Sequence, residues 1–242
     1  MRDIQLRFFM SLVSAWLLFL LTMSVFSVLN VDFTLADFFY RLQGSTWAWK
    51  DTFLAQGVIH KGGKWLSLLM GIATLILLIL SFSFDCLKEY RIPLLYLFSS
   101  TLISTLLVAT IKQWVSMECP WDLIRYGGVR GFIGLLDIRP PSLPASACFP
   151  AGHASAGYAW IALYFFCASV RPSWRWAGLA VGLGLGLAFG FAQQLRGAHF
   201  LSHDLWTLML CWTVSFALSK ALLPESVKPA PTLSLSPPAS TF

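Results

Sequence analysis

The sequence predicts an all-α, polytopic membrane protein with about six transmembrane helices and interfacial helices before the second span. Of its 242 residues, 57% are hydrophobic and 12% are charged, and the mean hydropathy is +0.70. A soluble domain of this length would need a larger charged surface. Several stretches of about twenty residues carry almost no charge, which is enough to cross about 30 Å of hydrocarbon as a helix.

The predicted spans, in chain order, are 8–29, 64–84, 92–117, 151–170, 175–195 and 200–223. The first is too long for the apolar core of a signal peptide, and no small-residue cleavage site follows it, so we expect it to be retained. The segment before the second span mixes charged and aromatic residues and is predicted to lie along the membrane interface. Residues 1–223 thus form one predicted transmembrane domain. The Pro- and Ser-rich tail 224–242 is predicted to be disordered.

Glycines recur at every fourth position within the fifth predicted span. Gly182, Gly186 and Gly190 therefore share one helix face. Small residues at this spacing let two helix backbones approach closely, so the pattern predicts tight helix packing.

The net charge of +6 points to anionic lipid headgroups, because many basic residues lie in short loops beside apolar spans. Neither a nucleic acid nor a protein partner is predicted. Six spans place both termini on one side. When five basic residues near a predicted anion site are set aside, the positive-inside rule favours cytoplasmic termini. These five are Lys112, Arg125, Arg130, Arg139 and Arg196.

Three clusters of chemically active residues fall where predicted helices meet the same membrane face. The first is Lys112 followed by Cys119-Pro120, the second is Pro150-Ala151-Gly152-His153, and the third runs from residue 196 to 204. The last two clusters contain three of the four histidines. Ionisable residues at membrane depth are costly to bury, so we interpret them as functional.

In order and spacing these clusters resemble the motifs of the type 2 phosphatidic acid phosphatase superfamily, which are Lys-x6-Arg-Pro, Pro-Ser-Gly-His and Ser-Arg-x5-His-x3-Asp. The members of this superfamily are membrane lipid phosphatases related to vanadium haloperoxidases. The resemblance covers roughly residues 60–223. Cys119 and Ala151 replace the arginine of the first motif and the serine of the second. Gln193 and His203 stand at the arginine and aspartate positions of the third.

The resemblance implies a metal-independent phosphatase of the acid phosphatase type, without a cofactor, acting on a lipid phosphate or pyrophosphate in the bilayer. It implies that His199 attacks phosphorus and forms a phosphohistidine, while His153 protonates the leaving group. Gly152 would offer a backbone N–H at a helix start. Lys112 would neutralise phosphate oxygens.

Two roles stay open after this comparison. The acceptor that orients His199 is either His203, at the family spacing, or Asp204, one residue later. The lost arginines would be replaced by Arg196, one helical turn from His199, and by Arg125 or Arg130 in the polar loop.

Three other interpretations remain. The three histidines 153, 199 and 203 are a possible metal site. The phosphohistidine is equally suited to a phosphotransferase that passes phosphate to another lipid. A transport or binding protein that lost catalysis would also keep a phosphate pocket. The lipid and the oligomeric state are not specified by the sequence.

Cys119 and Cys148 lie at the two ends of the polar loop. If the first two motifs surround one phosphate, these cysteines must be near each other. We expect the site on the periplasmic face of a bacterial-type inner membrane, which is oxidising, and therefore predict a disulfide. Closing a loop of about thirty residues would stabilise the fold by roughly 3–4 kcal/mol in the chain-entropy model. Cys86, Cys167 and Cys211 are expected to be free.

Overall fold

The computed structural model describes residues 2–53, 57, 61–135, 137–140 and 142–223, and the tail predicted to be disordered lies outside them. Within these ranges the chain is all-α, with no named strand and one isolated bridge between Leu123 and Arg130. The longer helices are α1 (Arg2–Val28), α2 (Val31–Leu42), α3 (Gly63–Ser83), α4 (Arg91–Trp114), α7 (Arg175–Leu195) and α8 (Leu201–Leu222).

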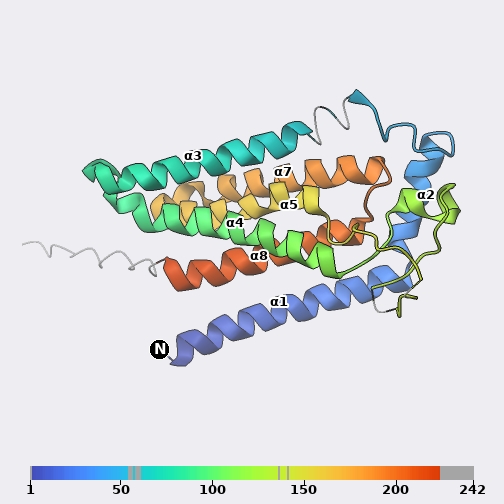
Figure 1. Cartoon of the computed structure of the whole chain (residues 1–242). Coiled ribbons are helices and arrows are strands. Elements are labelled where there is room, and N and C mark those ends of the chain that lie inside the picture. Colours follow the sequence, from blue (N-terminus) through green and yellow to red (C-terminus); the bar gives the residue numbers. More distant parts are fainter. Residues whose placement is uncertain (1, 54–56, 58–60, 136, 141, 224–242) are drawn as a thin grey trace, which may run out of the picture.

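The helices form an elongated bundle with two different ends (Figure 1). Helices α3, α4, α7 and α8 run side by side, α1 diverges along one edge, and α2 crosses one end of the bundle. The start of α1 and the end of α8 lie at the opposite end from α2. This arrangement agrees with the prediction that both ends of the transmembrane domain are on one side.

Five helical stretches are long and apolar enough to cross a membrane, namely Met10–Val28, Gly63–Ser83, Asp85–Trp114, Pro172–Leu195 and Leu201–Leu222. The remaining predicted span, 151–170, is divided into α5 (Gly152–Tyr158), a 3₁₀ turn η5 (Ala159–Ile161) and α6 (Ala162–Val170). The prediction of an all-α, polytopic membrane protein is confirmed. A sixth crossing by α5, η5 and α6 stays a prediction.

The glycine face of α7 lies against the divided helix. A Cβ atom built on Gly182 would overlap the backbone of Ile161, and one built on Gly186 would overlap the ring of Tyr158. Only glycine permits this approach between the two backbones. The predicted close packing is therefore confirmed, and it holds α5 firmly where its first turn enters the site.

Hydroxyl groups join α4 to α8 in the interior of the bundle. Ser100 Oγ lies 3.0 Å from Ser215 Oγ, and the Tyr96 hydroxyl donates to the Ser215 carbonyl at 3.0 Å. All three residues are buried. Small hydroxyl side chains let membrane helices approach while satisfying one another's polar groups.

Helix α4 ends at Trp114, three residues before its predicted end. Residues 115–118 lack helical structure, because they pair with the chain just before the second motif. The Cys148 N–H donates to the Met117 carbonyl at 3.3 Å, and the Ser146 N–H donates to Ser116 Oγ at 2.6 Å. This pairing brings the two ends of the polar loop together beside Lys112.

Candidate active site

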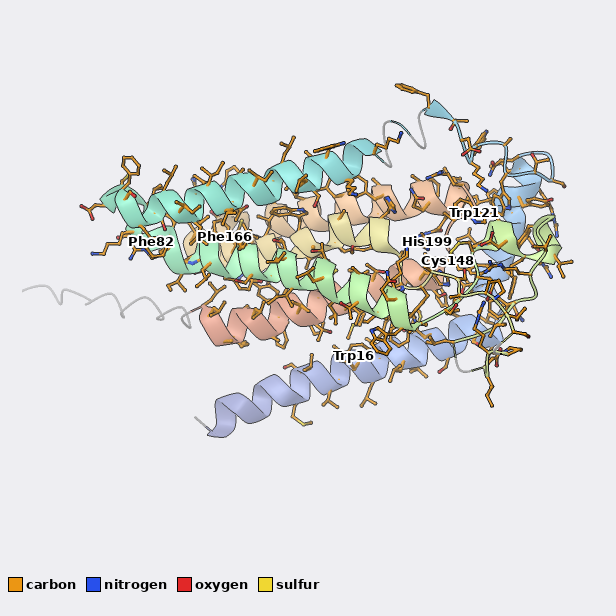
Figure 2. The ribbon with its side chains drawn as sticks, viewed as in Figure 1. Trp16, Phe82, Trp121, Cys148, Phe166 and His199 are labelled. Carbon is orange, nitrogen blue, oxygen red and sulfur yellow. A yellow bond between two sulfur atoms is a disulfide. The ribbon has the colours of Figure 1, made fainter. Side chains whose placement is uncertain are left out.

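The three motifs converge at the end of the bundle that α2 crosses. Lys112 is in the last turn of α4, and His153 is in the first turn of α5. His199 lies in the connection between α7 and α8. Figure 2 shows His199 close to Cys148 at this end, far from Phe82 and Phe166 at the other. The sequence prediction that distant motifs share one membrane face agrees with this arrangement.

Gly152 and Lys112 are in close contact. The position that a Cβ atom would take on Gly152 lies 3.5 Å from Lys112 Nζ and 3.7 Å from its Cδ. A larger side chain at residue 152 would therefore press on the lysine. The absence of a side chain lets the ammonium lie against the first turn of α5, next to His153.

His199 is buried, with 5% of its surface exposed. Burial lowers its pKa well below the usual value, and the neighbouring His203, Lys112 and His153 lower it further by charge repulsion. The imidazole is therefore neutral at pH 7. Among the described residues, its Nδ1 is buried and has no hydrogen-bond partner, and we expect Nε2 to be the nitrogen that meets a substrate.

His203 is fully buried in an aromatic enclosure. Its ring centroid lies 5.4 Å from Phe149, 5.5 Å from Phe200 and 5.8 Å from His199. The Cys148 carbonyl faces both imidazoles, and neither ring nitrogen of His203 has a hydrogen-bond partner among the described residues. Position 203 is thus adjacent to the predicted nucleophile, as the family spacing requires.

Asp204 points in another direction, toward α7. Its Oδ2 accepts a hydrogen bond from Gln194 Nε2, and a Cβ atom on Gly190 would lie 2.6 Å from the same oxygen. The other carboxylate oxygen has no partner among the described residues. Of the two predicted orienting residues, His203 is therefore the one that contacts the His199 ring.

A disulfide joins Cys119 to Cys148, with their Cα atoms 5.3 Å apart. It ties the end of the first motif to the second and fixes the segment that carries the Cys148 carbonyl. Cys86, Cys167 and Cys211 are free, as predicted. The position at which the family pattern has an arginine is therefore occupied by a covalent cross-link.

The two loop arginines predicted to bind phosphate are held by carboxylates. Arg125 donates to both oxygens of Asp37, at 2.8 and 2.6 Å, which raises the pKa of Arg125 and lowers that of Asp37. Arg130 Nη1 lies 3.9 Å from Oε1 of the buried Glu118. Arg139 Nη2 lies 2.7 Å from the same oxygen. Glu118 carries one negative charge for both Arg130 and Arg139, and Asp37 also pairs with Arg41. Phosphate binding by Arg125 or Arg130 stays a prediction, and neither residue lines the cavity described below.

Arg196 is also engaged. Its Nε donates to the Lys50 carbonyl at 2.6 Å and its Nη1 to Gln193 Oε1 at 3.1 Å. The guanidinium lies 5.9 Å from the ring of Trp121. Arg196 thus anchors the segment after α2 to the end of α7, and its predicted contact with phosphate stays a prediction.

Two polar residues, Asp32 in α2 and Gln43 directly after it, hold the connection that carries His199, which sequence reasoning did not foresee. Asp32 Oδ1 accepts from the Ser202 N–H at 2.9 Å and so caps the start of α8. Gln43 Nε2 donates to the Leu195 carbonyl at 2.8 Å, at the end of α7. These two bonds attach the α2 segment to the connection that carries His199, and the sequence signal was the mixture of polar and aromatic residues in that segment.

A cavity of about 630 Å³ extends from the site between α3, α4 and α5. Its polar end contains Lys64, Lys112, Gly152 and His153. From there it runs between apolar faces of α3 and α4. The apolar part includes Leu68, Ile72, Leu75, Phe98, Leu102 and Ala109.

The family model of the PAP2 superfamily matches residues 93–225, more than half of the chain. The chain belongs to the PAP2 superfamily. The matched region contains all three clusters, α4 except its first two residues, and the helices α5 to α8. Comparison with curated proteins and with solved structures gives no match.

Membership in the PAP2 superfamily indicates phosphatase activity on phosphate esters. This chain differs from the superfamily pattern in the source of its positive charge. Cys119 is in the disulfide, and Gln193 is buried and neutral. Lys112 is the family cation that this chain retains in the cavity.

The metal-site alternative finds no support in the donor geometry of this PAP2 protein. Among the described residues, the one group of three possible ligands within mutual reach is Cys119, Asp122 and Cys148. Two of these donors are joined in the disulfide. The three histidines do not form such a group, although they share the site.

Proposed function

We propose that this protein is a membrane phosphatase that hydrolyses the phosphate monoester or pyrophosphate of a lipid through a phosphohistidine on His199. The observation that carries the lipid assignment is the cavity, since it joins Lys112 and His153 to an apolar groove within the membrane region. From Lys64 to Leu75 the groove follows α3 for about 16 Å, at 1.5 Å per residue. A hydrocarbon tail fits that chemistry, and a water-soluble ester would leave the groove without a function.

The proposed reaction has two steps. In the first, His199 Nε2 attacks phosphorus, the bond to the lipid oxygen breaks, and that oxygen takes a proton from His153. In the second, water attacks the phosphorus of the phosphohistidine and gives a proton to His153, which releases phosphate and restores both imidazoles. Lys112 balances charge on the phosphate oxygens during both steps.

The location proposed for the site is the periplasmic face of a bacterial-type inner membrane, with cytoplasmic termini. Two observations support it. The disulfide closes the polar loop at the site end of the bundle, and disulfides persist in oxidising compartments. The start of α1 and the end of α8 lie at the other end of the bundle.

Purified protein is expected to release phosphate from at least one member of a panel of lipid phosphates and pyrophosphates. Activity should survive EDTA, because His199 and Lys112 supply the nucleophile and the charge, and vanadate should inhibit it as a mimic of five-coordinate phosphorus. Loss of activity on chelation with recovery on adding zinc would favour the three-histidine metal site. Transfer of phosphate to a second lipid without release to water would identify a phosphotransferase. No turnover, with lipid phosphate still bound, would favour the binding protein.

Gly71→Leu is expected to lower kcat/KM for a long-chain lipid phosphate by about tenfold and to leave a small soluble phosphate ester unaffected. Gly71 lines the cavity, and a Cβ atom there meets nothing within 4 Å. A leucine would therefore occupy the groove without disturbing the helix. Excluding about two methylenes of a tail from burial costs about 1.6 kcal/mol, which corresponds to about tenfold.

Gly184→Leu is the matched control. Gly184 lies on α7, a Cβ atom there also meets nothing within 4 Å, and the residue does not line the cavity. Its activity on both substrates should equal that of the unmodified protein. If Gly71→Leu changes kcat/KM by the same factor for long and short substrates, the cavity does not support the lipid assignment.

A further inference from the structure

A phosphate group in this site meets fewer cations than the motif pattern of its family provides. The arginine positions are held by Cys119 and Gln193. The arginines that the loop offers instead are paired with Asp37 or Glu118. A phosphate monoester carries up to two negative charges, and Lys112 balances one of them. A second cation would balance the other, and Arg196, which donates to the Lys50 carbonyl and to Gln193, does not line the cavity.

Lys64 is in the right place to supply it. Among the described residues, Lys64 and Lys112 are the lysines that line the cavity, and no arginine lines it. Lys64 is in the first turn of α3, which begins at Gly63, and Lys112 is in the last turn of α4. Because these helices run antiparallel, the two residues lie at the same end of the cavity, one on each helix.

Helical structure continues upstream of Lys64, because Lys61 and Gly62 are π-helical and Gly62 has right-handed helical dihedral angles (φ −63°, ψ −42°). The observation that concerns Lys64 is therefore the cavity that it lines, not a helix terminus. A lysine at a membrane boundary also has an ordinary role as an anchor to lipid headgroups. Lys61 is a control for this anchoring role, because it is exposed nearby and does not line the cavity.

We propose that Lys64 is a second substrate-binding cation, which contacts a phosphate oxygen of the lipid from the α3 side of the cavity. The inference rests on the proposed function. The oxygen belongs either to the reacting phosphate, opposite Lys112, or to a second phosphate between the reacting group and the tail. Both are the same chemistry for an ammonium group, and substrates with one or two phosphates distinguish them.

The test compares Lys64→Met with Lys64→Arg and Lys61→Met, using a lipid monophosphate and a lipid diphosphate with the same tail. Lys64→Met is expected to lower kcat/KM by about tenfold or more, as expected for loss of a charged hydrogen bond. Lys64→Arg should retain most activity, and Lys61→Met should retain all of it. Equal losses on both lipids place Lys64 at the reacting phosphate, and a loss confined to the diphosphate places it at the second.

Two results would overturn the proposal while leaving the phosphatase assignment intact. One is unchanged kcat/KM in Lys64→Met. The other is an equal loss in Lys64→Met and Lys61→Met, which would show general attraction by surface charge.

A binding measurement decides the proposal even if the protein turns over none of these lipids. A single-chain alkyl phosphate should raise the melting temperature of the unmodified protein more than the corresponding alkyl alcohol does. Lys64→Met should lose most of this difference, while Lys61→Met should keep it. An undiminished difference in Lys64→Met would refute the contact with phosphate independently of catalysis.

Discussion

His199→Ala is expected to abolish turnover, with kcat lowered at least about a thousandfold, because it removes the nucleophile rather than one of several binding contacts. His199 is neutral at pH 7, since burial and the neighbouring Lys112, His153 and His203 hold its pKa well below the usual value. The same lowered pKa should keep the nucleophile active in mildly acidic solution, with loss only as pH falls through the folded-state value. Steady-state assays across pH 4–8 on a lipid phosphate test both statements.

His199→Gln tests the role with less change in packing, because the residue is buried and alanine would leave a space. Both variants should fold with the disulfide intact and should still bind a lipid phosphate. Unmodified protein quenched during turnover should carry an acid-labile phosphate on His199, and neither variant should carry it. Substantial activity in either variant would refute the assignment of the nucleophile.

The sequence predicts the helices of this protein well because apolar length is a strong local signal. The expected spans 64–84, 175–195 and 200–223 differ from α3, α7 and α8 by at most one residue at either end. The expected end of the third span at residue 117 is wrong, since Ser116 and Met117 pair with the chain at 146–148. That pairing joins segments about thirty residues apart, so no local pattern predicts it.

In the candidate site, too, local sequence signals are predictable and contacts between distant segments are not. Lys112, His153 and His199 are recognisable from motif spacing, and the disulfide follows once the motifs are assumed to meet. The partners of the arginines are not recognisable. Asp37 is 88 residues before Arg125, and Glu118 is 21 residues before Arg139. Which carboxylate faces which guanidinium depends on how α2 and the loop pack, and periodicity does not encode that.

Lys64 illustrates the opposite case, in which a residue with an ordinary sequence context gains a specific position. In the sequence it is one of several basic residues before an apolar span, where interface anchoring is the usual role. In the fold it lines the same cavity as Lys112. The information that separates the two roles is the pairing of α3 with α4, which a single sequence does not display.

His153→Ala is expected to separate the two steps of the reaction. His153 is half-buried in the first turn of α5 and lines the polar end of the cavity, beside Lys112. With an alkoxide leaving group, loss of the proton donor should lower kcat by about 10²–10⁴-fold. With a nitrophenyl phosphate the leaving group needs no proton, so phosphorylation of His199 should proceed.

The second step should then limit His153→Ala, because the attacking water loses the group that accepts its proton. Rapid mixing with nitrophenyl phosphate should give a burst of nitrophenol approaching one equivalent, followed by slow release of phosphate. Radiolabelled phosphate should remain on the protein in His153→Ala and should be absent from the double variant His153→Ala, His199→Ala. A uniform loss of rate for both leaving groups, without a burst or bound phosphate, would show that His153 supports substrate binding rather than proton transfer.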